Sequence, residues 1–176
     1  MRTTLDTPKP TGKTPVSTKR PVSKPRSGAA VQGVGSLVDA FIQAPPSPAA
    51  AGRLAPGPLI ERLKEGLPIQ ELEHLGTHLD MSMEKLAPLL GISKATLHRR
   101  KLAGRLDTAE SDRLVRYAQL LGRAAAVMES LEAGRRWLSS PQRGLGGVIP
   151  LSYALTEVGS REVENLLGRI EYGVYS

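Results

Sequence analysis

The chain has 176 residues, of which 40% are hydrophobic and only 3% aromatic, so aliphatic side chains must supply most of a modest core. Its formal net charge of +7 is uneven: residues 1–58 hold eight Lys or Arg against two Asp or Glu, and residues 59–176 hold sixteen against fifteen. The absence of cysteine excludes disulfides and thiolate metal sites, and no apolar run is long enough for a membrane span or a secretory signal. We therefore expect a cytoplasmic protein without a membrane partner.

Residues 1–58 form a proline-rich segment. Ten of the fourteen prolines lie before Leu59, among Thr, Ser, Lys and Ala residues. Such a composition buries too little apolar surface to offset the entropy lost on ordering, so we predict that the segment is mostly disordered. The run from Val34 to Ile42 has enough apolar residues for a helical turn or two held by a partner, but its composition favours a linker.

From Pro58 onward, apolar residues recur at helical spacing. The first helix places Leu59, Ile60 and Leu63 on one face and is predicted to end at Gly66. No alternation typical of a strand extends over four or more residues outside short ambiguous runs, so we predict an all-α fold. Further helices are predicted over residues 68–78, 82–90, 93–101, 107–121, 124–138, 150–157 and 160–172. The helix over 107–121 either continues into the next one or breaks near residue 122. A loop is predicted over 141–147.

A capping box predicts the start of the long helix after residue 106. Asp107 occupies the N-cap position and Glu110 the third helical position, and an apolar face follows that consists of Leu114, Val115, Ala118 and Leu121. In the C-terminal part we expect Trp137 to be the central core residue. The pair Gly146-Gly147 is expected to supply a turn with unusual backbone angles.

Residues 86–100 have the pattern of a helix-turn-helix. Gly91 supplies the turn, Ser93 caps the second helix, and Ile92 and Leu97 are spaced to form a hydrophobic staple. With Leu97 facing inward, the opposite helix face is expected in the major groove of DNA. The predicted base-facing residues are Ala95, Thr96, His98 and Arg99, and the predicted DNA backbone contacts are Lys94, Arg100, Lys101 and Arg105. A solvated basic face on a protein-binding scaffold is the alternative interpretation.

The last predicted helix has an apolar and a polar side. The apolar stripe, which consists of Val163, Leu166, Leu167 and Ile170, is expected inside the domain, and Gly173 is expected to end the helix. The polar side and the chain end remain free for a partner. From composition alone, the terminal tyrosines would be expected in a frayed end with one ring against the domain.

Three stretches resemble a known family: residues 97–100 (Leu-His-Arg-Arg), residues 106–114 at the start of the long helix, and Trp137 to Gly173. They look like Xre-type antitoxins of the Xre/MbcA/ParS group, the partners of RES-domain toxins, over about residues 59–176. The resemblance implies a DNA-binding half that represses its own operon and a C-terminal half that neutralises the toxin. RES toxins are implied to degrade NAD, and the extreme C-terminus of the antitoxin is implied to block their active site.

With this resemblance, three parts are expected: a disordered basic tail over 1–58, a helix-turn-helix domain over 59–123 and a toxin-binding domain over 124–176. The resemblance also changes the interpretation of the terminal tyrosines, which become candidates to fill a pocket of the toxin. The predicted toxin-binding residues are Arg161, Glu164, Asn165, Gly168, Arg169, Glu171, Tyr172, Gly173, Val174, Tyr175 and Ser176.

Catalysis is not expected from a chain with three histidines and no cysteine. His74 and His78 have the spacing of metal ligands but lack a third ligand, so we interpret them as partly exposed surface residues. Residues 12–14 (Gly-Lys-Thr) mimic the end of a phosphate-binding loop, but Thr7 stands where that loop needs glycine. Carboxylate pairs are interpreted as solubilising groups: Glu71 with Glu73, and Glu162 with Glu164. No catalytic residue, metal or cofactor is predicted.

The leading hypothesis is an antitoxin that binds a cognate RES-domain toxin and operator DNA, as a homodimer within a hetero-oligomeric complex. The alternative is a stand-alone helix-turn-helix regulator whose C-terminal module only dimerises or binds another partner. A third class is an interaction adaptor that has lost DNA binding. A toxin reading frame beside this one would favour the first hypothesis, and an isolated locus the second.

Overall fold

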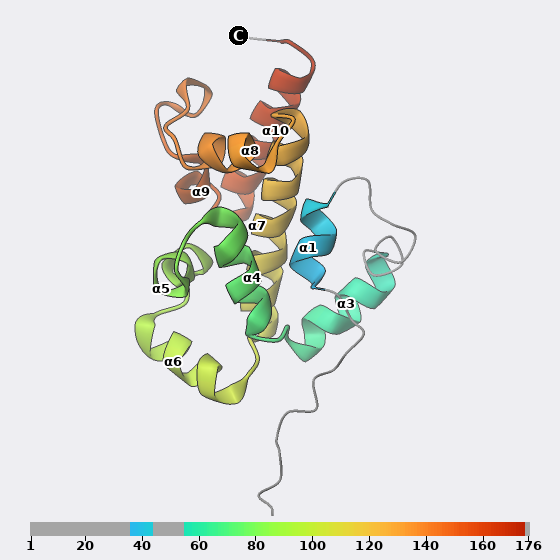
Figure 1. Ribbon diagram of the computed structural model, residues 1–176, viewed down its shortest axis with the longest axis vertical. Coiled ribbons are helices and arrows are strands. Elements are labelled where there is room, and N and C mark those ends of the chain that lie inside the picture. Colours follow the sequence, from blue (N-terminus) through green and yellow to red (C-terminus); the bar gives the residue numbers. More distant parts are fainter. Residues whose placement is uncertain (1–35, 44–54, 175–176) are drawn as a thin grey trace, which may run out of the picture. The chain divides into compact units, whose positions relative to one another are not determined.

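The computed structural model describes residues 36–43 and 55–174, which belong to one compact unit. Within these ranges the regular structure is helical, apart from two isolated β-bridges, so the all-α prediction is confirmed (Figure 1). The α-helices are α1 (Leu37–Ile42), α3 (Pro56–Glu65), α4 (Gln70–Leu79), α5 (Met83–Leu86), α6 (Lys94–Ala103), α7 (Thr108–Val127), α8 (Leu131–Leu138), α9 (Pro150–Tyr153) and α10 (Glu157–Glu171). The two 3-10 turns are η1 (Ala87–Leu90) and η2 (Arg143–Leu145).

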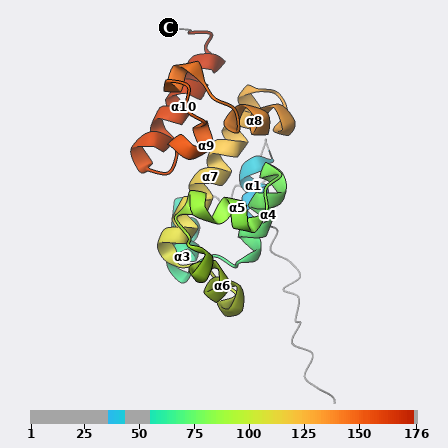
Figure 2. The same cartoon turned by 90° about the vertical axis from the view of Figure 1, so that its left-hand side faces the viewer.

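Helix α7 is the axis on which the other helices pack. Helices α1, α3, α4, α8 and α10 all contact it, as the two views in Figures 1 and 2 show. The predicted capping box is present, since the Glu110 N–H donates to Asp107 Oδ1 at 2.8 Å and the Asp107 N–H donates to Glu110 Oε2 at 2.8 Å. The helix then continues without a break through Gly122.

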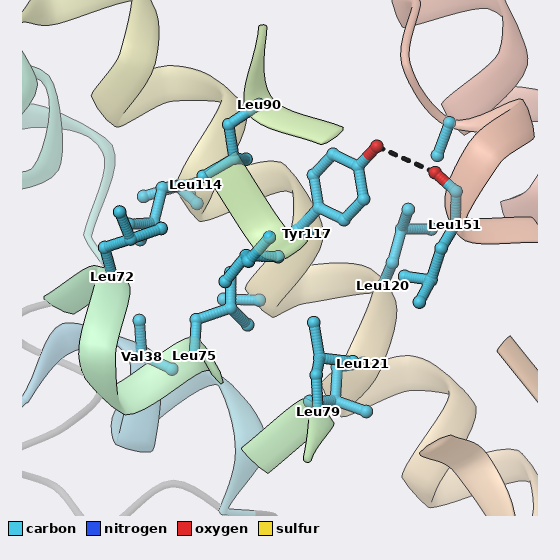
Figure 3. Packing of buried hydrophobic residues seen from close by; sticks show 14 of the residues in the cluster. Val38, Leu72, Leu75, Leu79, Leu90, Leu114, Tyr117, Leu120, Leu121 and Leu151 are labelled. Atoms are coloured by element: carbon cyan, nitrogen blue, oxygen red, sulfur yellow. Dashed lines mark hydrogen bonds between the residues drawn. The ribbon is translucent and has the colours of Figure 1, made fainter. Parts of the chain in front are cut away.

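The core contains more of α7 than the predicted apolar face. Leu114, Val115, Ala118 and Leu121 are buried, as predicted, but Tyr117 and Leu120 are buried as well (Figure 3). Because partners cover α7 on several sides, a single stripe at helical spacing underestimates its buried surface. No helix in the described ranges combines the length and the apolar character needed to cross a membrane.

Several predicted helices have different bounds in the structure, and the one predicted over 124–138 is α8, which begins only at Leu131. The segment over 82–90 divides into α5 and η1, because Pro88 lacks the N–H that an α-helix would need there. Helix α10 begins at Glu157, three residues before the predicted start, because the Thr156 hydroxyl accepts a hydrogen bond from the Gly159 N–H at 3.1 Å. Helix α9 accordingly ends at Tyr153.

The interpretation of Val34 to Ile42 as a linker is wrong for residues 37–42, which form α1. Leu37 and Val38 are fully buried, and α1 packs against α4 and α7. The Glu71 carboxylate accepts hydrogen bonds from the N–H groups of Leu37 at 2.9 Å and Val38 at 3.0 Å, and from the Ser36 hydroxyl at 2.7 Å. Glu71 is therefore a buried structural residue, and its interpretation as a solubilising group is also wrong. Helix α3 begins at Pro56, so the predicted disordered segment also includes the first residues of this helix.

His74 and His78 also face α1. The His78 Nε2 lies 2.6 Å from Asp39 Oδ1, and the His74 Nδ1 lies 3.5 Å from Asp39 Oδ2. Both imidazole side chains stay partly exposed, at 45% for His74 and 25% for His78. The described residues contain no group of side chains arranged to hold a metal ion, and the two histidines contribute to the contact between α1 and α4.

In the C-terminal part, Trp137 is not the central core residue. It is partly buried at the edge of the core, whereas the adjacent Leu138 is fully buried. Helical geometry turns successive side chains by about 100°, so only one of the two neighbours can face α7 fully. The predicted turn is confirmed, since Gly146 and Gly147 have φ values of 67° and 82°.

Candidate functional site

The helix-turn-helix is formed by α5, η1 and α6, with a turn at Gly91. Gly91 has a left-handed φ of 68°, which glycine adopts without a steric cost. The Ser93 hydroxyl accepts a hydrogen bond from the Thr96 N–H at 3.1 Å, so the predicted cap is present. Ile92 and Leu97 are both buried in the core, as the hydrophobic staple requires. Because Leu97 is the one buried residue of α6, most of this helix is accessible.

The first turns of α6 carry most of the predicted base-facing residues on an accessible surface. Ala95, His98 and Arg99 are exposed, and Thr96 is half-buried. The Arg99 Nη2 donates to the Thr96 hydroxyl at 3.3 Å, which holds the guanidinium along the helix surface. Leu102, which the sequence did not single out, is 77% exposed on the same helix.

The predicted DNA backbone contacts differ from one another in the structure. Lys94 is exposed, but Arg100 is held by Glu110 at 2.7 Å and by Asp107 at 2.6 Å. The hydrogen bond to Glu110 is the main reason that the pKa of Arg100 is raised. The guanidinium of Arg100 therefore connects α6 to the start of α7 rather than lying free.

The other two predicted cations also make contacts within the chain. The Lys101 Nζ lies 2.9 Å from Glu84 Oε1, and this hydrogen bond lowers the pKa of Glu84. The Arg105 Nη2 donates to the Gly66 carbonyl at 2.7 Å. The side chains of Lys101 and Arg105 remain accessible, yet their charged ends already have partners.

The second candidate surface lies at the end of α10. Val163 and Leu167 are fully buried, and Leu166 and Ile170 are partly buried, so the predicted apolar stripe faces inward. Helix α10 ends at Glu171 with Tyr172 as its C-cap, and Gly173 follows with a φ of 67°. The Val174 N–H donates to the Arg169 carbonyl at 2.9 Å.

Beyond this helix end, side chains are open to solvent. Tyr172 is 79% exposed and Val174 is 55% exposed. The candidates Tyr175 and Ser176 lie outside the described residues. The described end of the chain therefore leaves the folded core with its side chains accessible to a partner.

An open groove runs beside this end of α10. Six of the predicted toxin-binding residues line it, together with Arg123 and Glu162: Glu164, Asn165, Gly168, Arg169, Tyr172 and Val174. Within the described residues, the buried Nε of Arg169 has no hydrogen-bond partner. Sequence reasoning missed Arg123, because this residue comes from α7 and reaches the groove only through packing of two helices distant in sequence.

Two predicted toxin-binding side chains make ion pairs within the chain. Arg161 lies 3.1 Å from Glu157, one turn earlier in α10. Glu171 lies 2.8 Å from Arg123, which ties the end of α10 to α7. Both pairs are exposed, and such pairs contribute little to stability.

Helix α7 joins the two candidate surfaces. It begins beside the helix-turn-helix and continues under α8 and α10, so the predicted domain boundary at residues 123–124 falls within one helix. The Tyr117 hydroxyl donates to the Leu151 carbonyl at 2.8 Å, which connects α7 with α9 (Figure 3). Burial raises the pKa of the Tyr117 phenol to about 12, although the nearby Arg116 opposes this effect.

Two family models match the chain. Residues 58–119 match the Antitoxin Xre-like helix-turn-helix domain, and residues 123–173 match the Antitoxin Xre/MbcA/ParS C-terminal toxin-binding domain. An Antitoxin Xre from Yersinia enterocolitica is 31% identical over 121 residues, covering 67% of this chain and 81% of that protein. The chain belongs to the Xre antitoxin family.

Other relatives agree with this assignment. An Antitoxin Xre from Photorhabdus laumondii is 31% identical over 116 residues, which cover 65% of this chain and 78% of that protein. A protein from a Sphingobium species named Prs ADP-ribosylating antitoxin is 25% identical over 136 residues, which cover 70% of this chain and 84% of that protein. This Xre antitoxin therefore has a toxin partner and a DNA-binding helix-turn-helix, with α6 inside the first matched domain and α10 inside the second.

Proposed function

We propose that this Xre antitoxin neutralises a RES-domain toxin, an enzyme that degrades NAD, by placing its C-terminal end in the active site of the toxin. The observation that carries the proposal is the accessible end of α10, where Tyr172 and Val174 are exposed beside an open groove. Val163 and Leu167 hold the helix in the core, so its end has a defined direction. Little conformational entropy is then lost when this end enters a pocket.

The groove supplies polar groups next to that end. Asn165, Arg169 and Tyr172 carry hydrogen-bond donors along the groove. Interfaces commonly concentrate binding energy in Arg and Tyr side chains. We assign the toxin-binding surface to this groove and to the chain end that follows it.

The same proposal includes repression of the antitoxin's own operon through α6. Arg99 is accessible for a guanine edge, and Ala95, Thr96 and His98 share the accessible part of the helix. A homodimer within the toxin–antitoxin complex would place two copies of α6 on half-sites about 34 Å apart. The proposed compartment is the cytoplasm, where both operator DNA and NAD are available.

The experiment compares the full chain with a chain that ends at Tyr172, each co-expressed with the neighbouring toxin reading frame. The shortened chain should keep its circular dichroism spectrum and promoter binding, because every residue of the buried α10 stripe is retained. It should lose protection of growth, because the end no longer reaches the toxin site. Val158→Ala is a matched control, since Val158 is exposed in the first turn of α10, away from the groove.

Full growth rescue by the shortened chain at equal expression would contradict the plugging mechanism. The groove around Glu164, Asn165 and Arg169 would then be the neutralising surface. Failure of the full chain to bind or neutralise any neighbouring gene product would favour the stand-alone regulator instead.

A further inference from the structure

A large apolar side chain lies on the accessible face of α6. Leu102 is 77% exposed. It follows Ala95 by seven residues, which is close to two helical turns. It follows His98 by four residues and Arg99 by three, and side chains at these spacings are neighbours on a helix surface. Leu102 therefore shares its face with three predicted base-facing residues, opposite the buried Leu97.

The charged side chains of α6 are divided between its two sides. Arg100 and Lys101 follow Leu97 by three and four residues, so they lie on the inner side of the helix. There they pair with Glu110 at 2.7 Å and with Glu84 at 2.9 Å. Helix α6 itself contains four Lys or Arg residues and no acidic residue. The outer face therefore has no carboxylate of α6 that would repel DNA phosphates.

The polar and apolar groups of this outer face occupy different parts of it. The Arg99 Nη2 donates to the Thr96 hydroxyl at 3.3 Å, which holds the guanidinium over the first turns of α6. Leu102 lies near the other end of the helix. Because side chains of a helix lean toward its N-terminus, Leu102 covers the surface beside His98. The face thus ends in an apolar surface next to polar groups.

The end of α6 that carries Leu102 is fixed to the rest of the domain. The carbonyl of Gly104, the C-cap residue, accepts a hydrogen bond from the Ile69 N–H at 3.0 Å. The next residue, Arg105, donates to the Gly66 carbonyl at 2.7 Å. Leu102 is two residues from this fixed point, so its side chain is presented at a defined place. Little conformational entropy is lost when such a side chain meets a partner.

The major groove of DNA offers one apolar group to a leucine side chain, the C5-methyl group of thymine. The other base-edge groups there are hydrogen-bond donors and acceptors, which leucine cannot bind. Seven helical residues span about 10 Å, and base pairs are about 3.4 Å apart. A helix lying along the groove would therefore place Leu102 about three base pairs from the base beside Ala95.

We propose that Leu102 is a specificity-determining residue of α6 that contacts the methyl group of a thymine in the major groove. The inference rests on the proposed binding of operator DNA by α6 and adds an apolar contact to its predicted polar ones. A methyl group removed from water against an apolar side chain strengthens binding about fourfold. The proposed homodimer requires one such thymine in each half-site.

The test uses promoter duplexes that differ by one methyl group. Each thymine of the promoter fragment is replaced in turn by uracil, which forms the same base pair but lacks the methyl group. Binding of the full chain and of Leu102→Ala is measured for every duplex. Uracil at the contacted thymine should weaken binding of the full chain about fourfold. Leu102→Ala should bind the thymine duplex about fourfold more weakly, and the same uracil should cause no further loss.

Two further variants control for the size and the site of the change. Leu102→Met keeps an apolar side chain of similar volume, so it should keep the preference for thymine. Leu155→Ala is the matched control, because Leu155 is 49% exposed in the loop between α9 and α10. It should leave both the affinity and the preference unchanged. Because both leucines are exposed, the variants should keep the circular dichroism spectrum of the full chain.

The outcomes separate this inference from the function on which it rests. Equal losses for the full chain and Leu102→Ala at every uracil position would overturn the role of Leu102 alone. Unchanged promoter binding by Leu102→Ala, combined with a weaker toxin complex or a changed oligomeric state, would also overturn it, since Leu102 would then contact protein. Equal binding of the full chain to the promoter and to an unrelated duplex would refute specific recognition by α6, and the role of Leu102 with it.

Discussion

Tyr117 connects α7 with the C-terminal part of the chain. Its ring is buried in α7 and its hydroxyl donates to the Leu151 carbonyl at 2.8 Å. Tyr117→Phe keeps the ring and removes the hydrogen bond, so we expect the free energy of unfolding to fall by about 0.5 to 1.5 kcal/mol at neutral pH. Chemical denaturation followed by circular dichroism measures this difference.

The same residue predicts how stability depends on alkaline pH. Burial raises the pKa of Tyr117 from 10.0 to about 12 in the folded chain, so the folded state keeps the phenol proton more tightly than the unfolded state. This contribution is fully present below pH 10 and is lost as the pH rises toward 12. The free energy of unfolding should therefore fall less steeply over this range for Tyr117→Phe. Equal slopes for both proteins would contradict the assigned burial effect.

At the scale of elements, α1 shows how a short segment outside the matched family domains completes the core. The close approach of Phe41 to Gly122 leaves no space for a side chain at this position of α7. Gly122→Ala should therefore displace α1 and lower the free energy of unfolding by about 1 to 3 kcal/mol, although alanine is the better helix former.

A matched glycine tests that explanation. Gly57 lies in α3 with no heavy atom within 4 Å of an added Cβ. Gly57→Ala should leave stability unchanged or raise it by up to about 1 kcal/mol, because it removes only backbone freedom. If both substitutions had the same effect on thermal unfolding, close packing of α1 on α7 would not be the cause.

At the scale of the whole molecule, one helix carries two surfaces that should act separately. Helix α7 packs against η1 at one end and against α8 and α10 along the rest. Arg99→Ala should weaken promoter binding by about 1 to 3 kcal/mol, because Arg99 is accessible on α6. Arg99 does not line the groove of α10.

Arg99→Ala should leave neutralisation of the toxin intact in a growth assay. Arg136→Ala, an exposed arginine of α8, serves as its control in promoter binding. Loss of both activities in Arg99→Ala, with an unchanged circular dichroism spectrum, would show that the two surfaces are coupled rather than separate.

The sequence alone predicted the features that depend on neighbouring residues. The all-α class, the capping box at Asp107, the cap at Ser93 and the end of α10 before Gly173 all follow from local spacing and backbone preference. The apolar stripe of α10 was predictable for the same reason, because a helix brings residues three and four apart onto one face. The assignment to the Xre antitoxins rested on short local motifs of this kind.

Tertiary structure decided what depends on residues far apart in the chain. Glu71 is buried because α1, more than thirty residues earlier, presents N–H groups to its carboxylate. Arg100 binds Glu110, and Arg123 reaches the groove of α10, because separate helices pack there. Composition favoured a linker for Val34 to Ile42, because a short apolar run has no stable partner within its own segment. The partners that make residues 37–42 a helix lie in α4 and α7. Burial and ion pairing are properties of the packed chain, so they required the structure.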